Sequence, residues 1–163
     1  MNATVYNYYS AFRKLNADAM INCYSNSIIY KDPLFGILQS EDVFIKTKML
    51  CDILRNSEFK LKLISNSKIE DVIVVHWEAD LLFGKKKREI ICQIKSEFIV
   101  ERETITSHTD DFSINNLAVQ ATGLKGSIVG STSFFKRKLL DKSQALFNRY
   151  ERVYRNAFLT ENH

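Results

Sequence analysis

Two long stretches, "DVIVVHWEADLLF" (residues 71–83) and "EIICQIKSEFIV" (residues 89–100), decide the fold of this 163-residue chain. Both are rich in β-branched residues, and in both the apolar side chains recur at every second position. This is the period of a strand with one buried face. The polar segment "GKKKR" (residues 84–88) joins the two stretches. We therefore predict a hairpin of two long antiparallel strands, with Ile73, Val75, Trp77 and Ala79 facing the core.

The regions on either side of this hairpin define the fold class. "FKLKLIS" (59–65) and "TITSHTDDF" (104–112) also alternate with a period of two. Before them, residues 3–24 have helical spacing interrupted at "LNADAM" (15–20), where Asn16 and Asp18 are suited to cap a second helix. "SIIYKDP" (27–33) predicts a short strand, and residues 41–56 a helix whose period runs through Val43, Lys48 and Met49. Because strands and helices do not alternate, we predict an α+β fold in which a curved antiparallel sheet wraps around N-terminal helices.

Composition excludes several classes of protein. With 45% hydrophobic and 26% charged residues, the chain is a globular domain rather than a disordered segment. A net charge of +4 is too mild for a nucleic-acid-binding surface over the whole domain. The three cysteines are too far apart to predict a metal site or a disulfide framework. We see no signal peptide, membrane span or cofactor motif, and predict a cytoplasmic protein without a cofactor.

Asp32 is the first candidate site residue, because it precedes Pro33, the only proline in the chain. Asp-Pro is a common way to end a strand, so Asp32 could simply form a turn. The alternative is a carboxylate held for chemistry. Proline restricts the residue before it to extended backbone angles and so gives the Asp32 side chain a defined direction. The local sequence does not choose between these two interpretations.

The second candidate site consists of His108 and Asp110, which are separated by one residue. These residues alternate with Phe112 on one face of the last predicted strand. Two ionisable groups beside a phenylalanine are costly to bury unless they bond each other, a ligand or water. An orienting hydrogen bond between them is one interpretation, and an exposed polar rim or dimer contact is the other. The sequence offers no third ligand at suitable spacing, so we predict no metal site.

The order of these segments resembles the nuclear transport factor 2-like superfamily, and in particular its SnoaL-like branch. The resemblance rests on "LNADAMINCYSNSIIYKDPLFG" (15–36), on the hairpin, and on "ITSHTDDFSINNLAVQATGLKG" (105–126). It implies a cystatin-like cone over residues 1–126, in which a bent sheet wraps the helices and leaves a pocket. The superfamily includes ketosteroid isomerase, limonene epoxide hydrolase, polyketide cyclases and non-enzymatic binding domains, so the fold by itself decides little about function.

The resemblance also implies roles for particular residues. Asp32 matches the general base of ketosteroid isomerase, whereas the acidic oxyanion donor of that enzyme falls near Ser96, so steroid isomerisation is not expected. His108 and Asp110 resemble the acid–base pair of SnoaL-like proteins. We predict cofactor-free acid–base chemistry, namely isomerisation, cyclisation or dehydration, on a small apolar ligand with a carbonyl group, and a homodimer. The predicted ligand-binding residues are Tyr8, Tyr30, Trp77, Ser96 and Phe112. The alternative is a non-catalytic binding or dimerisation domain.

Residues 127–163 are predicted to be a C-terminal basic amphipathic extension. Residues 134–158 carry seven basic and two acidic side chains. The apolar stripe consists of Phe135, Leu139, Leu146, Tyr150, Val153 and Phe158. Such a helix can lie on an anionic membrane surface. The favoured interpretation is that it packs on its own domain or on a dimer mate, with a solvated basic face.

Overall fold

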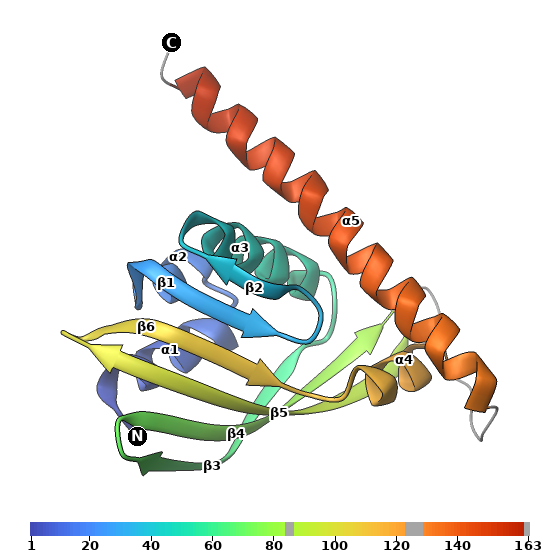
Figure 1. Ribbon diagram of the computed structural model, residues 1–163, viewed down its shortest axis with the longest axis horizontal. Helices are drawn as coiled ribbons and strands as arrows, with labels where there is room; N and C mark the ends of the chain where they lie inside the picture. The colour runs from blue at the N-terminus through green and yellow to red at the C-terminus, as the bar shows by residue number, and fades with distance from the viewer. Residues whose placement is uncertain (84–86, 123–128, 162–163) are drawn as a thin grey trace.

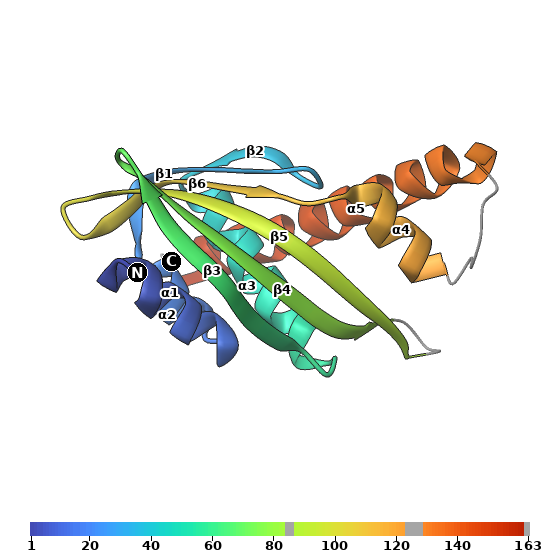
Figure 2. The ribbon, with the colours of Figure 1, turned by 90° about the horizontal axis from the view of Figure 1, so that it is seen from below.

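A six-stranded sheet forms the centre of the molecule in the computed structural model, which describes residues 1–83, 87–122 and 129–161. The strands are β1 (Tyr24–Asp32), β2 (Gly36–Gln39), β3 (Lys60–Ile69), β4 (Val72–Phe83), β5 (Arg88–Glu101) and β6 (Thr104–Asp111). The helices are α1 (Ala3–Arg13), α2 (Ala17–Ile21), α3 (Glu41–Arg55), α4 (Ile114–Thr122) and α5 (Val129–Glu161). Figures 1 and 2 show the sheet curving around the N-terminal helices, as the α+β prediction requires.

The strand order is β2-β1-β6-β5-β4-β3, and it corrects one part of the prediction. Four of the five neighbouring pairs are antiparallel, but β1 runs parallel to β6. The sheet is therefore mixed rather than wholly antiparallel. A period of two is the same for either strand direction, so the sequence pattern carried no information about this pair. The register places Tyr30 opposite His108.

The core lies between the concave face of the sheet and α1. The predicted inner residues of β4, namely Ile73, Val75, Trp77 and Ala79, are all buried. Asn2 caps α1 by accepting a hydrogen bond from the backbone N–H of Thr4 at 2.9 Å, and Asn16 caps α2 as predicted. The buried face of α1 packs against the sheet, where aromatic rings fill the concave side. The rings belong to Tyr8, Tyr9, Phe12, Trp77 and Phe98.

Helix α5 packs across α3 and α4 (Figure 1). Phe147 is buried against Ile45 and Met49 of α3. Arg155 adds ion pairs to Glu41 at 2.7 Å and Asp42 at 3.0 Å, at the N-terminus of α3. The boundary expected at residues 126 and 127 lies outside the described residues. Among the helices in the described ranges, none has the length and apolar character needed to cross a membrane.

Candidate functional site

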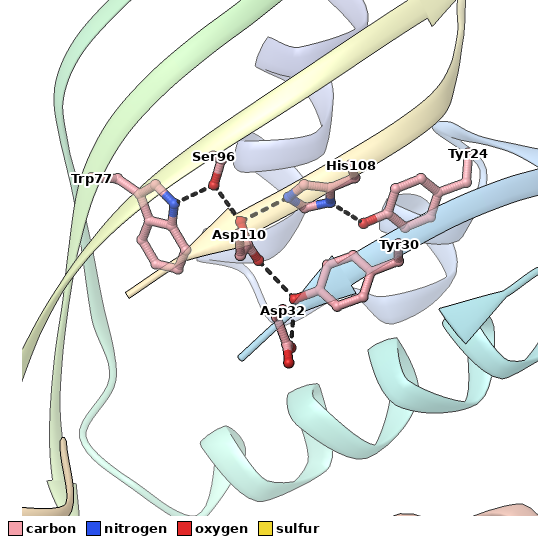
Figure 3. A network of polar contacts seen from close by, with 7 residues as sticks. All are labelled: Tyr24, Tyr30, Asp32, Trp77, Ser96, His108 and Asp110. Carbon is pink, nitrogen blue, oxygen red and sulfur yellow. Dashed lines mark hydrogen bonds and ion pairs between the residues drawn. The ribbon is translucent and has the colours of Figure 1, made fainter. Parts of the chain in front are cut away.

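The parallel pairing of β1 with β6 brings the three predicted catalytic residues together. Asp32 ends β1, while His108 and Asp110 lie on the neighbouring strand β6. All three side chains belong to one buried hydrogen-bond network, which also includes Tyr24 and Tyr30 (Figure 3). Residues far apart in sequence thus meet because two strand ends coincide at one edge of the cone.

Asp110 lies at the centre of the network. Its Oδ1 atom accepts a hydrogen bond from Nε2 of His108 at 2.9 Å and a second, short one from the hydroxyl of Ser96. Its Oδ2 atom accepts from the hydroxyl of Tyr30 at 2.8 Å. The direct bond to His108 is the orienting contact considered from the sequence. Since both side chains are buried, they do not form an exposed rim.

His108 is held on both ring nitrogens and on both faces. Its Nδ1 atom lies 2.8 Å from the hydroxyl of Tyr24, and its ring stacks on Phe98 with the centroids 4.2 Å apart. Because the ionised Asp110 needs a donor at Oδ1, a proton is assigned to Nε2, and Nδ1 pairs with the Tyr24 hydroxyl. The side chain is only 1% exposed. A ligand in solvent therefore does not reach the imidazole directly.

Asp32 forms the turn that the sequence suggested and also belongs to the network, while its role as a base stays a prediction. Its Oδ1 atom accepts hydrogen bonds from the backbone N–H groups of Leu34 and Phe35, both at 2.7 Å, which is the geometry of a turn-forming aspartate. Its Oδ2 atom lies 2.8 Å from the hydroxyl of Tyr30. The turn therefore fixes the carboxylate, and the second oxygen is left facing the network.

The predicted hydroxyl and indole donors are already used inside the protein. Nε1 of Trp77 donates to Oγ of Ser96 at 2.8 Å, and Ser96 donates in turn to Asp110. Tyr8 is buried in edge-to-face contact with His108, with the ring centroids 5.4 Å apart. Phe112 is half-buried and packs on the core. Their role in binding a ligand stays a prediction; Ser96, held by Trp77, is the one that bonds a carboxylate directly.

Lys46 of α3 is the site residue that the sequence interpretation missed. Its side chain is buried at 6% exposure, and its Nζ atom lies 3.8 Å from the centroid of the Tyr30 ring. The helical period predicts Lys48 on the buried face of this helix, but Lys48 is half-buried and pairs with Asp18. The signal was present, because Lys46 is three residues from both Val43 and Met49, which are buried.

The charges around Asp110 decide its ionisation. Burial by itself raises the pKa of Asp110, but the charge of His108, its hydrogen bond and the charge of Lys46 outweigh burial. The pKa of Asp110 therefore lies well below its usual range, and the group is ionised. Burial, followed by the charges of Asp110 and Asp32, raises the pKa of Tyr30 well above its ordinary value. Tyr30 thus keeps its proton.

The two aspartates reach solvent through a depression of about 320 Å³ at the ends of β1 and β6. Its lining consists of Lys31, Asp32, Pro33, Lys95, Glu97, Thr109, Asp110 and Asp111. The lining is mostly charged, which does not suit the apolar ligand implied by the resemblance. A larger depression of about 830 Å³ lies beside the N-terminus and β3, and no predicted site residue lines it.

In the described ranges, no three His, Cys, Asp or Glu side chains are gathered as metal ligands.

No protein-family model matches this chain, and no curated protein matches it in sequence. Solved structures do match it. A protein with a ketosteroid isomerase-like fold from Catenulispora acidiphila, in complex with trimethylamine, is 13% identical over 77% of this chain and 95% of its own, with a TM-score of 0.63. An LEH-like epoxide hydrolase from M. tuberculosis is 14% identical over 74% of this chain and 87% of its own, with a TM-score of 0.59.

An NTF2-like protein of unknown function from Cytophaga hutchinsonii is 17% identical over 69% of this chain and 99% of its own, with a TM-score of 0.57. At these identities the likeness shows the fold and not the activity, so the SnoaL-like branch stays a prediction. Enzymes and proteins of unknown function share this architecture. The chain therefore has the fold of the NTF2-like proteins, the superfamily whose cone its sequence resembles.

Proposed function

We propose that this protein binds a small ligand in the depression at the ends of β1 and β6 and moves a proton on it without a cofactor. One observation carries the proposal. The carboxyl groups of Asp32 and Asp110 both line this depression and are joined, through Tyr30, to a buried hydrogen-bond network. A network of this kind holds acid and base groups in a defined geometry, which proton transfer requires.

The roles divide between the two aspartates. A carboxylate with a strongly lowered pKa is a weak base, so Asp110 is better suited to orient His108 and Tyr30 than to accept a proton from a ligand. Asp32 is then the base. Its fixed Oδ1 atom and its place on the wall of the depression support that role. Tyr30 links the two carboxyl groups and provides the path along which a proton passes between them.

The ligand class follows from the lining of the depression. Lys31 and Lys95 offer positive charge for a carbonyl, enolate or carboxylate oxygen, and Asp32 lines the same depression. We therefore infer a small polar carbonyl compound rather than an apolar one. Proton abstraction beside the carbonyl, as in an isomerisation, cyclisation or dehydration, is the matching class of reaction.

A proton-exchange assay tests this proposal. The protein is incubated in D₂O with a panel of small carbonyl compounds, and loss of the α-proton signal is followed by NMR. We expect exchange with at least one compound, and a fall of roughly 10²-fold in Asp32→Asn, the usual contribution of a positioned base. Asp18→Asn is the matched control, since the Asp18 side chain is 83% exposed on α2, away from the site. Equal rates in both variants, or no exchange by the wild type, would contradict the proposal.

A specific observation favours a second candidate, a non-catalytic binding or dimerisation domain. The concave side of the sheet is filled by aromatic rings, and His108 is shielded from solvent. In this alternative, the network stabilises the fold and contacts with partners occur elsewhere, through a homodimer or through α5. Analytical ultracentrifugation tests the dimer. If the protein is dimeric and the exchange assay is negative, this second function is the better one.

A further inference from the structure

The hydroxyl of Tyr30 forms an unusual bridge between two carboxyl groups. It lies 2.8 Å from Oδ2 of Asp32 and 2.8 Å from Oδ2 of Asp110. A phenol has one proton, so it donates a full hydrogen bond to one carboxylate at a time. The other short contact then joins two oxygen atoms without a proton between them. The bridge needs either a second proton or a nearby positive charge.

A second proton has only one place to go. Oδ1 of Asp32 already accepts two backbone N–H groups, and Oδ1 of Asp110 accepts from His108 and Ser96. Since all of these partners are donors, neither Oδ1 atom is suited to carry a proton. An added proton would therefore lie on the line from Oδ2 of Asp32 through Tyr30 to Oδ2 of Asp110 (Figure 3).

Apart from His108, which is already bound to Asp110, Lys46 is the interior group that brings positive charge to the bridge. Burial is the first cause that raises the pKa values of Tyr8, Tyr9, Tyr24 and Cys92, so these groups stay neutral at neutral pH. His108 is paired with Asp110. On the rim, Lys95 pairs with Glu97 at 2.6 Å, while Lys31 and Asp111, both exposed, line the depression.

Lys46 lies where the bridge needs a cation. Its ammonium group is 3.8 Å from the centroid of the ring whose hydroxyl forms the bridge. Within the described part of the chain, its Nζ atom has no hydrogen bond or ion pair; the residue as a whole is 6% exposed, and Nζ is not among the fully enclosed polar atoms. A cation over a tyrosine ring strengthens the hydroxyl as a donor and stabilises nearby negative charge. We propose that Lys46 is a positioning residue that keeps both carboxyl groups of the Asp32–Tyr30–Asp110 bridge ionised.

This inference rests on the proposed function, because an ionised Asp32 is what a base requires. It adds a residue from α3 to a site otherwise built from the sheet. Without the ammonium group, the bridge would take up a proton, Asp32 would be neutral, and Tyr30 would be hydrogen-bonded on both sides. Lys46 would then determine the pH above which the site acts as a base.

The test uses the protein without a ligand, so its failure is distinct from failure of the exchange assay. Aspartate is labelled with ¹³C at the carboxyl carbon, and the signals of Asp32 and Asp110 are titrated by NMR. In Lys46→Met we expect the higher of the two midpoints to rise by roughly one to three pH units, the usual effect of one nearby charge on a carboxyl group. Lys46→Arg should restore the wild-type titration, because it restores the charge.

Lys48→Met is the matched control, since Lys48 lies on the same helix and its side chain is 39% exposed. Its titration should equal that of the wild type. If Lys46→Met does not fold, Lys46→Gln against Lys46→Arg gives the same comparison, because the two variants keep a polar end and differ in charge. Unchanged midpoints in the neutral variant, or a rise in Lys46→Arg equal to that in Lys46→Met, would overturn the inference.

Discussion

Tyr30 donates a hydrogen bond to Asp110 over 2.8 Å, although 80 positions separate the two residues in the sequence. The contact exists because β1 and β6 run side by side in the same direction. It joins the Asp-Pro turn to the His108 pair, so two weak sequence signals become one site.

The bridging hydroxyl should contribute measurably to stability. Tyr30→Phe removes the donor and leaves two buried carboxylate oxygens without it. We expect the free energy of unfolding to fall by about 1–3 kcal/mol, the usual cost of an unsatisfied buried group. Urea denaturation measures the change. Tyr6→Phe is the control, because Tyr6 is exposed on α1. A loss no larger than that of the control would show that the bridge is not a stabilising contact.

Stability should depend on pH through Asp110. Burial raises the pKa of Asp110, but the lowering effects of His108 and Lys46 are larger in sum. The pKa of Asp110 in the folded protein therefore lies below the unfolded value of about 3.9. A depressed folded pKa adds stability above the unfolded pKa, and this stability is lost as the pH falls toward the folded value. We expect the unfolding free energy to fall progressively below about pH 5.

Asp110→Asn provides the comparison for this pH dependence, measured by urea denaturation at a series of pH values. The variant should be less stable at neutral pH, and its stability should change less between neutral and acid pH. If the pH dependence of Asp110→Asn equals that of the wild type, the carboxylate is not the group responsible.

Breaking the buried pair of His108 and Asp110 should be costly. His108→Leu removes the charge and the hydrogen bond and leaves Asp110 buried with fewer partners. Removing one member of a buried pair typically costs about 3–5 kcal/mol. A double-mutant cycle with Asp110→Leu isolates the interaction, because the double variant has neither partner. Additive losses would indicate that the two side chains act independently.

Apolar packing should hold α5 on α3 more strongly than the ion pairs of Arg155. Phe147 is buried against Ile45 and Met49, and we expect Phe147→Ala to cost about 3 kcal/mol. Arg155 is half exposed, and exposed pairs contribute at most about 1 kcal/mol each. Thermal unfolding of Phe147→Ala and Arg155→Ala compares the two. A larger loss in the arginine variant would reverse this order.

Helix α5 should not insert into a lipid bilayer, because Leu146, Phe147 and Tyr150 pack against the domain. The exposed apolar side chains in the described part of this helix, Phe134 and Val153, lie 19 positions apart and form no continuous apolar face. We expect no binding to phosphatidylcholine vesicles, and at most a weak, salt-sensitive association with phosphatidylserine vesicles. Flotation measures both. Lys138→Glu with Lys142→Glu, two exposed changes, should abolish any such association. Tight binding that persists at high salt would support the membrane interpretation instead.

The sequence by itself determined most of the elements and the inner face of β4, but it did not predict β2 (Gly36–Gln39). The alternation in β4 correctly placed Ile73, Val75 and Trp77 in the core, and Asn16 was correctly identified as a cap. These features are local, since a strand with one buried face repeats every two residues and a cap lies within one helical turn. The local sequence also selected the candidate residues: Asp32 precedes the proline, and His108 and Asp110 are ionisable groups beside Phe112 on one strand face.

The tertiary structure decided which of these residues meet. The parallel pairing of β1 with β6, the bridge through Tyr30 and the burial of Lys46 over its ring are all contacts between distant segments. The hydrophobic period of a strand or helix predicts on which face a side chain lies. It does not predict which strand is the neighbour in the sheet or in which direction that neighbour runs. The Asp-Pro step could therefore be read from the sequence as a turn or a base, and only the neighbouring strand shows that its carboxylate serves both the turn and the network.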